Sequence, residues 1–537
     1  MDKKLLLLTL TGVTATAAMA QKDIDKPNFV VILVDDLGYS DFSCYGGVIP
    51  TPNIDKLAER GVRMSQMYNA ARSCPTRASL LTGLYPQQAG VGHMTADLTN
   101  ETGSAAYQGY LNETSVTMAE VLGSNGYFTS MVGKWHVGHA KGVTPSKRGF
   151  QRALHSAAGG FYFPQDEKAV LFLDDQKISN DDPRLPKNWY STDLWTNMGI
   201  QFINEAINDK KPFFLYLANN APHFPLQALA DEIAKFKGKF SKGWDVLREE
   251  IYERQVAMNL LGKTYPLTKR NPLVPFWKDL DPEQKKKSEH TMEIYAAAIK
   301  KVDDNVGTLV ADLKAKGVFD NTVIIILSDN GGNAEGQTVF GTYQGENPGQ
   351  VNSNVFVGQA WAGMSNTPFY LYKHHTHEGG IATPCVISYP KGIPVGMNGK
   401  VVHQPGHLVD VMATLVGISK AKYPSRYNDH AITPMQGVNL LPLWQGKNLQ
   451  RKEPIFWEHE GNIALREGKW KLVKEDKEKE FQLYDMENDR TEMNDLSEKE
   501  PAKVKEMMQK YEKKYTHVGA KPFKMKQFRW FVPVAEY

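Results

Sequence analysis

Cysteine is scarce in this chain of 537 residues, which contains only Cys44, Cys74 and Cys385. An odd number of cysteines cannot all pair, and three are too few for a disulfide framework. Their spacing also lacks the paired pattern of a cysteine zinc site. The sequence therefore excludes a disulfide scaffold, and its length suits one large domain with a smaller one beside it.

The chain also lacks an excess of charge of either sign, since its net charge is +3 at pH 7. Near balance at this length gives no reason to expect nucleic acid or an anionic membrane as a partner. A membrane span needs about 20 apolar residues, and the apolar run at the N-terminus is shorter. We therefore expect neither nucleic-acid binding nor stable membrane insertion.

Residues 1–20 have the pattern of a secretory signal peptide. Two lysines precede an apolar run over residues 5–10, and an A-x-A cleavage site follows at residues 18–20. A basic, then an apolar, then a small-residue segment is typical of an export signal. A buried N-terminal helix is the alternative. We predict cleavage between Ala20 and Gln21 and a periplasmic or secreted protein.

Three continuous apolar runs predict buried strands, at residues 29–34, 213–217 and 322–327. Continuous rather than alternating apolarity indicates burial on both faces of a sheet. Helical patterns at residues 51–58 and 295–313 lie between these runs, so the fold class is α/β. Polar residues follow each run directly. Because ligands bind at the carboxyl ends of strands in open α/β sheets, these polar residues are candidates for a site.

The pattern changes after residue 450. Short strand-like segments and then a charged helix follow, at residues 454–457, 464–466, 469–473, 481–485 and 500–515. We expect a large N-terminal domain over residues 21–450 and a smaller C-terminal α+β subdomain, with a small antiparallel sheet and a helix, over residues 451–537. Residues 230–290 are charged and irregular in pattern, which predicts a surface insertion.

Acidic and amide side chains follow two of the predicted strands. Asp35 and Asp36 follow the first, and Asp329 and Asn330 follow the third. Four oxygen-bearing side chains brought together at strand ends would suit a hard cation such as calcium or magnesium. Each pair taken alone could instead form a turn or cap a helix.

The segment that begins at Ser73 resembles the signature of the type I sulfatase family. In that family a Cys or Ser, with Pro two places on and Arg four places on, is oxidised to formylglycine (3-oxoalanine). Pro75 and Arg77 are in register with Ser73, but each is one place short of the register of Cys74. The resemblance implies that Ser73 is the formylglycine precursor and Cys74 a bystander. A serine precursor further implies a maturation enzyme of the radical SAM type.

Further blocks follow in the order of the family. D-D-x-G at residues 35–38 and D-N-G at residues 329–331 match the family's metal ligands. G-K-W-H at residues 133–136, P-H-x-P at residues 222–225 and a lysine ahead of E-G-G at residues 378–380 match its catalytic cations. The resemblance implies one Ca²⁺ per chain held by Asp35, Asp36, Ser73, Asp329 and Asn330. It implies catalytic roles for Ser73, Arg77, Lys134, His136, His223 and Lys373.

The implied roles follow from the charge of the reaction. A sulfate ester is anionic and its cleavage places charge on the leaving oxygen, so fixed cations stabilise the transition state. By resemblance, Arg77 and Ca²⁺ polarise the nucleophile, Lys134 orients it, His136 accepts a proton, and His223 and Lys373 serve the leaving oxygen. Each residue alone could be a packed histidine, a surface lysine or a salt-bridged arginine. Ala382 stands where many members have an arginine.

The resemblance is strongest to the bacterial arylsulfatase-like branch. It implies an alkaline-phosphatase-like sandwich with a mixed, largely parallel central sheet. It also implies an exported sulfatase acting on sulfated carbohydrates, such as host or algal glycans, through a formylglycine gem-diol and a covalent sulfo-enzyme intermediate. Two alternatives stay open: a phosphodiesterase or phosphonate monoester hydrolase on the same fold, and a catalytically dead glycan-binding homologue.

Overall fold

The computed structural model describes residues 26–475 and 480–522. The predicted signal peptide over residues 1–20 lies outside the described residues. Among the helices in the described ranges, none is long and apolar enough to cross a membrane.

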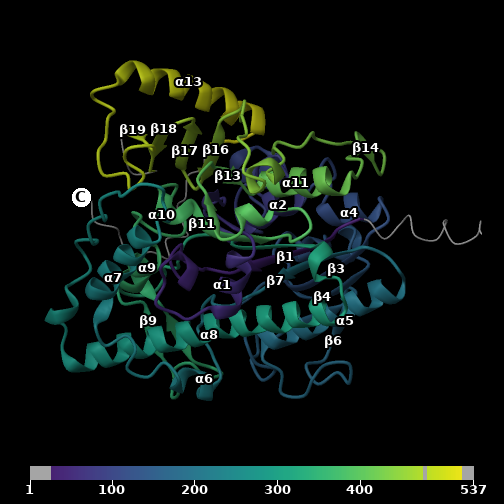
Figure 1. The fold of residues 1–537 in the computed structure, drawn as a ribbon, viewed down its shortest axis with the longest axis horizontal. Helices are drawn as coiled ribbons and strands as arrows, with labels where there is room; N and C mark the ends of the chain where they lie inside the picture. The colour runs from purple at the N-terminus through teal and green to yellow at the C-terminus, as the bar shows by residue number, and fades with distance from the viewer. Residues whose placement is uncertain (1–25, 476–479, 523–537) are drawn as a thin grey trace, which may run out of the picture.

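A mixed sheet of eleven strands forms the centre of the molecule (Figure 1). Its middle strands β8, β1, β7, β3 and β4 are parallel, and β11 is antiparallel to both β8 and β2. The order along the sheet is β12-β2-β11-β8-β1-β7-β3-β4-β5-β6, with β13 also paired to β2. The strands are β1 (Asn28–Val34), β2 (Val62–Tyr68), β3 (Phe128–Lys134), β4 (Arg152–Ser156), β5 (Leu171–Leu173), β6 (Gln176–Ile178), β7 (Phe213–Ala218), β8 (Thr322–Ser328), β11 (Ala382–Ser388), β12 (Lys400–Val402) and β13 (Gly406–His407).

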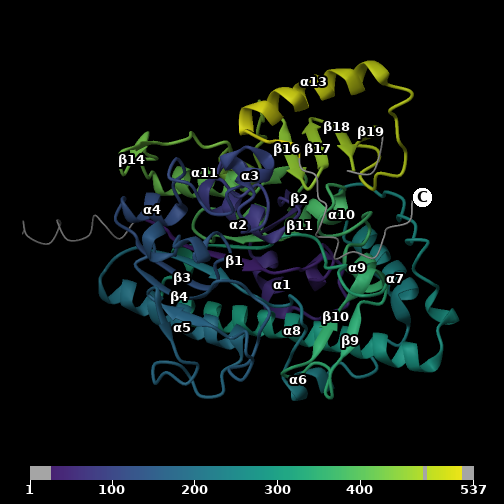
Figure 2. The same ribbon diagram turned by 180° about the vertical axis from the view of Figure 1, so that it is seen from behind.

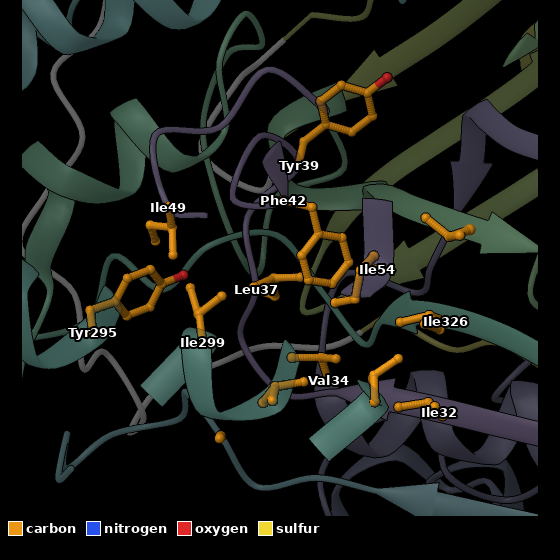
Figure 3. Close-up of a cluster of buried hydrophobic side chains, with 14 of the residues drawn as sticks. Ile32, Val34, Leu37, Tyr39, Phe42, Ile49, Ile54, Tyr295, Ile299 and Ile326 are labelled. Atoms are coloured by element: carbon orange, nitrogen blue, oxygen red, sulfur yellow. The ribbon is translucent and has the colours of Figure 1, made fainter. Parts of the chain in front are cut away.

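Helices cover both faces of this sheet (Figures 1 and 2). Helices α1 (Pro52–Glu59), α5 (Ser191–Asn208) and α8 (Pro282–Ala315) lie on one face, and α2 (Ser73–Thr82), α4 (Met118–Gly123) and α11 (Val409–Ser419) lie on the other. In Figure 3, Ile32 and Val34 of β1 and Ile326 of β8 lie near Ile299 of α8 in one buried cluster. Side chains on both faces of β1 and β8 are buried, which explains why these runs are apolar throughout. The predicted sandwich with a mixed, largely parallel sheet is confirmed.

Residues 230–290, predicted as a surface insertion from their charged and irregular pattern, contain helices that the sequence did not predict. This region contains α6 (Ala230–Ala234), α7 (Gly243–Ala257) and the first turns of α8. Trp244 of α7 is buried with its ring edge-on to Trp277 and Trp361, at centroid distances of 4.9 and 5.4 Å. Helix α7 was not predicted because its sequence is highly charged. Its buried contacts are with aromatic side chains that are distant in the sequence.

A separate antiparallel sheet of four strands lies near the C-terminus, under helix α13 (Pro501–Val518) (Figure 1). Its strands are β16 (Ile455–His459), β17 (Asn462–Glu467), β18 (Trp470–Lys474) and β19 (Gln482–Asp485). Met507 and Tyr511 of α13 pack with Phe456 and Leu465 in a small core of their own. The remaining elements are α3 (Thr99–Thr102), α9 (Gly358–Ser365), α10 (Glu378–Ile381), α12 (Leu441–Trp444), β9 (Thr342–Gln344), β10 (Asn354–Phe356), β14 (Arg426–Tyr427) and β15 (His430–Ala431).

Candidate active site

The register of β1 and β8 brings the predicted acidic residues together. Val34 pairs with Ser328 in the parallel ladder, so Asp35 and Asp329 leave the sheet at the same edge. The backbone N–H of Asp36 donates a 3.1 Å hydrogen bond to Asp329 Oδ1. This turn holds Asp36 in the left-handed region, at φ 65°. All three carboxylates are fully buried, which is costly unless charged partners surround them.

Ser73 lies among these carboxylates, at the first residue of α2. Its Oγ is 3.0 Å from Asp35 Oδ1 and also hydrogen-bonds with Asp329 Oδ2. Lys134 Nζ lies 3.3 Å from Ser73 Oγ. Cys74 instead belongs to the hydrophobic cluster on that face of the sheet, where burial raises the pKa of its thiol to about 11. A thiol that stays protonated is a poor nucleophile, which agrees with a bystander role.

Arg77 and Lys134 neutralise the acids around Ser73. Arg77 Nη2 lies 3.0 Å from Asp329 Oδ2, and Arg77 Nη1 donates to the Lys134 carbonyl oxygen at 3.0 Å. Lys134, the last residue of β3, places its Nζ 2.7 Å from Asp35 Oδ2. Both cations are almost fully buried, so their charges act at low dielectric.

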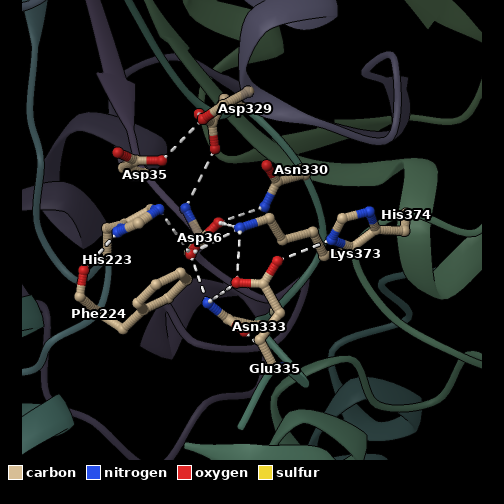
Figure 4. Close-up of polar contacts among 12 residues, drawn as sticks. Asp35, Asp36, His223, Phe224, Asp329, Asn330, Asn333, Glu335, Lys373 and His374 are labelled. Carbon is tan, nitrogen blue, oxygen red and sulfur yellow. Dashed lines mark hydrogen bonds and ion pairs between the residues drawn. The ribbon is translucent and has the colours of Figure 1, made fainter. Parts of the chain in front are cut away.

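Lys373 and His223 approach Asp36 from opposite sides (Figure 4). Lys373 Nζ lies 2.9 Å from Asp36 Oδ1, and His223 Nε2 lies 3.6 Å from Asp36 Oδ2. Burial alone would raise the pKa of Asp36, but Lys373 and His223 hold it well below its usual range. At Asp329, burial and the charge of Asp35 raise the pKa to about 6. The two acids therefore differ in how well the protein's own cations balance them.

A cation fits the oxygen atoms at this edge of the sheet. Asn330 Nδ2 donates to Asp36 Oδ1 at 2.8 Å, while the buried Asn330 Oδ1 has no hydrogen-bond partner among the described residues. Asp35, Asp36 and His223 each offer a ligand atom, all within 4.8 Å of one another. Because the donors are mostly carboxylate and amide oxygens, the site suits a hard ion such as Ca²⁺.

The two predicted histidines are both neutral near pH 7. Burial, with Lys134 and Arg77 nearby, holds the pKa of His136 well below its usual value. Burial likewise lowers the pKa of His223 to about 4, although Asp36 opposes the shift. His223 stacks on Phe224 and its Nδ1 lies 2.6 Å from the Phe224 carbonyl oxygen. That bond fixes the tautomer with the proton on Nδ1, which leaves the lone pair of Nε2 facing the site.

Two polar residues at this site escaped the sequence analysis. Asn333 Nδ2 donates to Asp36 Oδ2 at 2.7 Å, and Glu335 Oε2 lies 3.5 Å from Lys373 Nζ. Both follow the D-N-G block in the same loop, and that proximity was the one signal available. They set the orientation of Asp36 and Lys373.

A buried charge cluster ties the loop of Lys373 to the C-terminal sheet. Glu378 accepts hydrogen bonds from Lys471 Nζ at 2.9 Å, Arg490 Nε at 3.2 Å and Tyr68 Oη at 3.1 Å. Glu492 accepts from Lys471 Nζ and from the backbone N–H of Glu378, both at 2.7 Å. The C-terminal sheet thus holds the segment that carries Lys373.

Comparison with known proteins decides the family. A family model described as Sulfatase matches residues 27–421, and one described as N-sulphoglucosamine sulphohydrolase, C-terminal, matches residues 369–520. The chain belongs to the type I sulfatase family. An arylsulfatase of Klebsiella aerogenes is 34% identical over 85% of this chain and 100% of its own length. A sulfatase of Schizosaccharomyces pombe, described as uncharacterized, is 33% identical over 91% of this chain and 93% of its own.

A solved structure agrees with the fold. The crystal structure of Ps i-CgsB in complex with k-i-k-neocarrahexaose has a TM-score of 0.68 and 28% identity, covering 93% of this chain and 94% of that one. Family membership and these relatives confirm the prediction that this sulfatase is a sulfuric ester hydrolase. The role of each side chain in the reaction stays a prediction, which the geometry above makes specific.

Proposed function

We propose that this sulfatase hydrolyses sulfate esters of carbohydrates outside the cytoplasm, with formylglycine made from Ser73 as its nucleophile. The observation that carries the proposal is the position of Ser73 Oγ, 3.0 Å from Asp35 and 3.3 Å from the ammonium of Lys134. The carbohydrate class is supported by Ps i-CgsB, whose crystal structure contains an oligosaccharide. Export rests on the signal-peptide pattern of residues 1–20.

Ser73 as encoded is a weak nucleophile, because a serine hydroxyl at its ordinary pKa needs activation. Hydrated formylglycine would supply two geminal hydroxyls, one for attack on sulfur and one whose loss of a proton would release the sulfate. Ca²⁺ held by Asp35, Asp36, Asp329 and Asn330 would supply a fixed positive charge beside that group. The unpaired Asn330 Oδ1 and the oxygen donors around it support this ligand set.

The buried cations of this chain bind and orient the sulfate. Arg77, Lys134 and Lys373 place three positive charges around Ser73 and Asp36. Asp36 and Glu335 raise the pKa of Lys373 against the effect of burial, so Lys373 keeps its proton at neutral pH. It can therefore donate to the leaving oxygen. Charges fixed where negative charge develops stabilise the transition state.

The histidines divide the proton transfers. Neutral His136 can accept a proton, which is the role that releases sulfate. His223 holds its proton on Nδ1 against the Phe224 carbonyl, so its Nε2 donates only after it has gained a second proton. Of the two candidate donors to the leaving oxygen, Lys373 thus has a proton ready in the resting site.

The test uses the full chain co-expressed with a radical SAM maturase. Mass spectrometry of the peptide that contains Ser73 should show the loss of two hydrogens. Position-defined sulfated mono- and oligosaccharides should then be turned over, with nitrophenyl sulfate hydrolysed faster than nitrophenyl phosphate. Faster phosphate turnover would overturn the assignment, and turnover of nitrophenyl sulfate alone would remove the carbohydrate class.

Two neighbouring substitutions separate the nucleophile from its bystander. Ser73→Ala should abolish turnover, whereas Cys74→Ala, one residue further along α2, should keep it. The opposite result would show that the motif is read in the wrong register. N-terminal sequencing of exported protein should begin at Gln21, and an unprocessed chain would contradict the signal peptide.

A further inference from the structure

A second cluster of metal-ligating side chains lies beside the loop of Lys373. His374 follows Lys373 directly, while His459 ends strand β16 and Glu460 follows it. A ligand atom from each of the three lies within 4.8 Å of the others, and all three residues are buried. We propose that His374, His459 and Glu460 form a second metal site, which binds an ion of the Zn²⁺ class.

Two distances between ligand atoms in this cluster are close to those around a tetrahedral Zn²⁺ ion. His374 Nδ1 lies 3.5 Å from one oxygen of Glu460, and His459 Nε2 lies 3.4 Å from the other. Ligands at ~2.0–2.1 Å from Zn²⁺ in a tetrahedron are about 3.3–3.4 Å apart. These separations are too long for hydrogen bonds of normal strength and suit atoms that share one ion.

His459 is a buried imidazole with no hydrogen bond of normal length among the described residues. It is 1% exposed, and neither of its ring nitrogens has a hydrogen-bond partner among the described residues. A buried polar group left unsatisfied destabilises the fold. An ion bound at Nε2 would satisfy that nitrogen.

The surroundings supply the outer contacts of a metal site. His374 Nε2 lies 2.8 Å from Glu335 Oε1 (Figure 4). Its other ring nitrogen, Nδ1, lies 3.5 Å from Glu460 Oε2. A carboxylate on the far nitrogen of a ligating histidine is the usual device that orients the ring. Arg72 and His93 both contact Glu460 Oε1 and fix that carboxylate. The charge of Arg72 opposes a second cation, so we expect weaker binding than in a site without it.

The donor set favours an ion of the Zn²⁺ class. Two imidazoles and one carboxylate suit Zn²⁺, in contrast to the oxygen donors around Asp36. The ion would join the C-terminal sheet to the loop of Lys373.

Calorimetric titration of the full chain with Zn²⁺, in excess Ca²⁺, tests the site. The wild-type chain should bind one equivalent, and Co²⁺ in its place should give the visible absorption of a tetrahedral site. His459→Ala and Glu460→Gln should abolish both signals. Glu335→Gln should weaken binding about 10–100-fold, the usual effect of losing an outer partner. Maturation of Ser73 is not required, so the result is independent of the proposed reaction.

His155→Ala is the matched control. His155 is also fully buried, and neither ring nitrogen has a hydrogen-bond partner within residues 26–475 and 480–522. It lies in β4 against Phe172 and is in neither group of metal-ligating side chains found in those residues. It should leave the stoichiometry at one. No uptake by the wild-type chain, or equal uptake by both site variants, would overturn the proposal. The titration of the wild-type chain can refute the proposal by itself, even if a variant fails to fold.

Discussion

Replacing Lys471 by methionine removes one positive charge from the buried cluster around Glu378. Lys471, Glu378 and Arg490 are fully buried, and Lys471 contacts both Glu378 and Glu492, at 2.9 and 2.7 Å. In the variant Glu378 would keep its contact with Arg490, whereas Glu492 would lose the ammonium 2.7 Å away. Breaking a buried ion pair by removing one partner costs about 3–5 kcal/mol, because an uncompensated charge stays buried. We expect the free energy of unfolding to fall by that amount.

Lys469→Met provides the comparison on the neighbouring turn of the same sheet. Lys469 pairs with Asp485 at 2.9 Å, but 41% of its side chain is exposed. An exposed pair contributes about 0–1 kcal/mol. Guanidinium denaturation followed by tryptophan fluorescence should therefore separate the two variants by at least about 2 kcal/mol. Equal midpoints and slopes would refute the reasoning that burial makes this cluster essential.

Three further predictions concern the pH dependence, the proposed calcium site and the packing. Burial opposes protonation of His377, yet Glu492 and Glu475 raise its pKa from 6.5 to about 9. Its protonated form therefore stabilises the fold in full below pH 6.5, and about 3 kcal/mol is lost as the pH rises through 9. The free energy of unfolding of His377→Gln should therefore change less with pH over that range than that of the wild type. An unchanged dependence on pH would contradict this. Calcium at 100 times its Kd should add about 2.7 kcal/mol to wild-type stability, measured against chelator, and much less to Asn330→Leu; an equal response of the variant would exclude Asn330 as a ligand. Trp244→Ala should cost about 3–5 kcal/mol in thermal unfolding, and a neutral result would show that α7 is loosely packed.

The strand-end acids could be predicted because their signal is local. Continuous apolar runs marked β1 and β8, and parallel pairing then requires Asp35 and Asp329 to leave the sheet at one edge. Ser73, Lys134 and Lys373 came from motif spacing. That spacing identifies them without any information about the rest of the chain, and the structure places them in one site.

The remaining contacts depend on packing between distant segments, which no local pattern contains. Glu460 meets His374 only because the C-terminal sheet packs on the loop of Lys373. Glu378 was read as part of a motif, whereas its partner Lys471 looked like an ordinary strand lysine. Helix α7 was missed for the same reason, since its burial comes from Trp277 and Trp361.

The burial of Ser73 determines the order in which folding and oxidation of this residue can occur. Its side chain is walled by carboxylates that follow β1 and β8, strands far apart in the sequence that must pair to create the pocket. At 3% exposure, Ser73 is out of reach of any second enzyme once those strands have met. Under the proposed function, oxidation must therefore come before folding. The active fraction of a preparation would then depend on the rate of Ser73 oxidation relative to the rate of folding. Adding maturase to the folded protein would not raise that fraction.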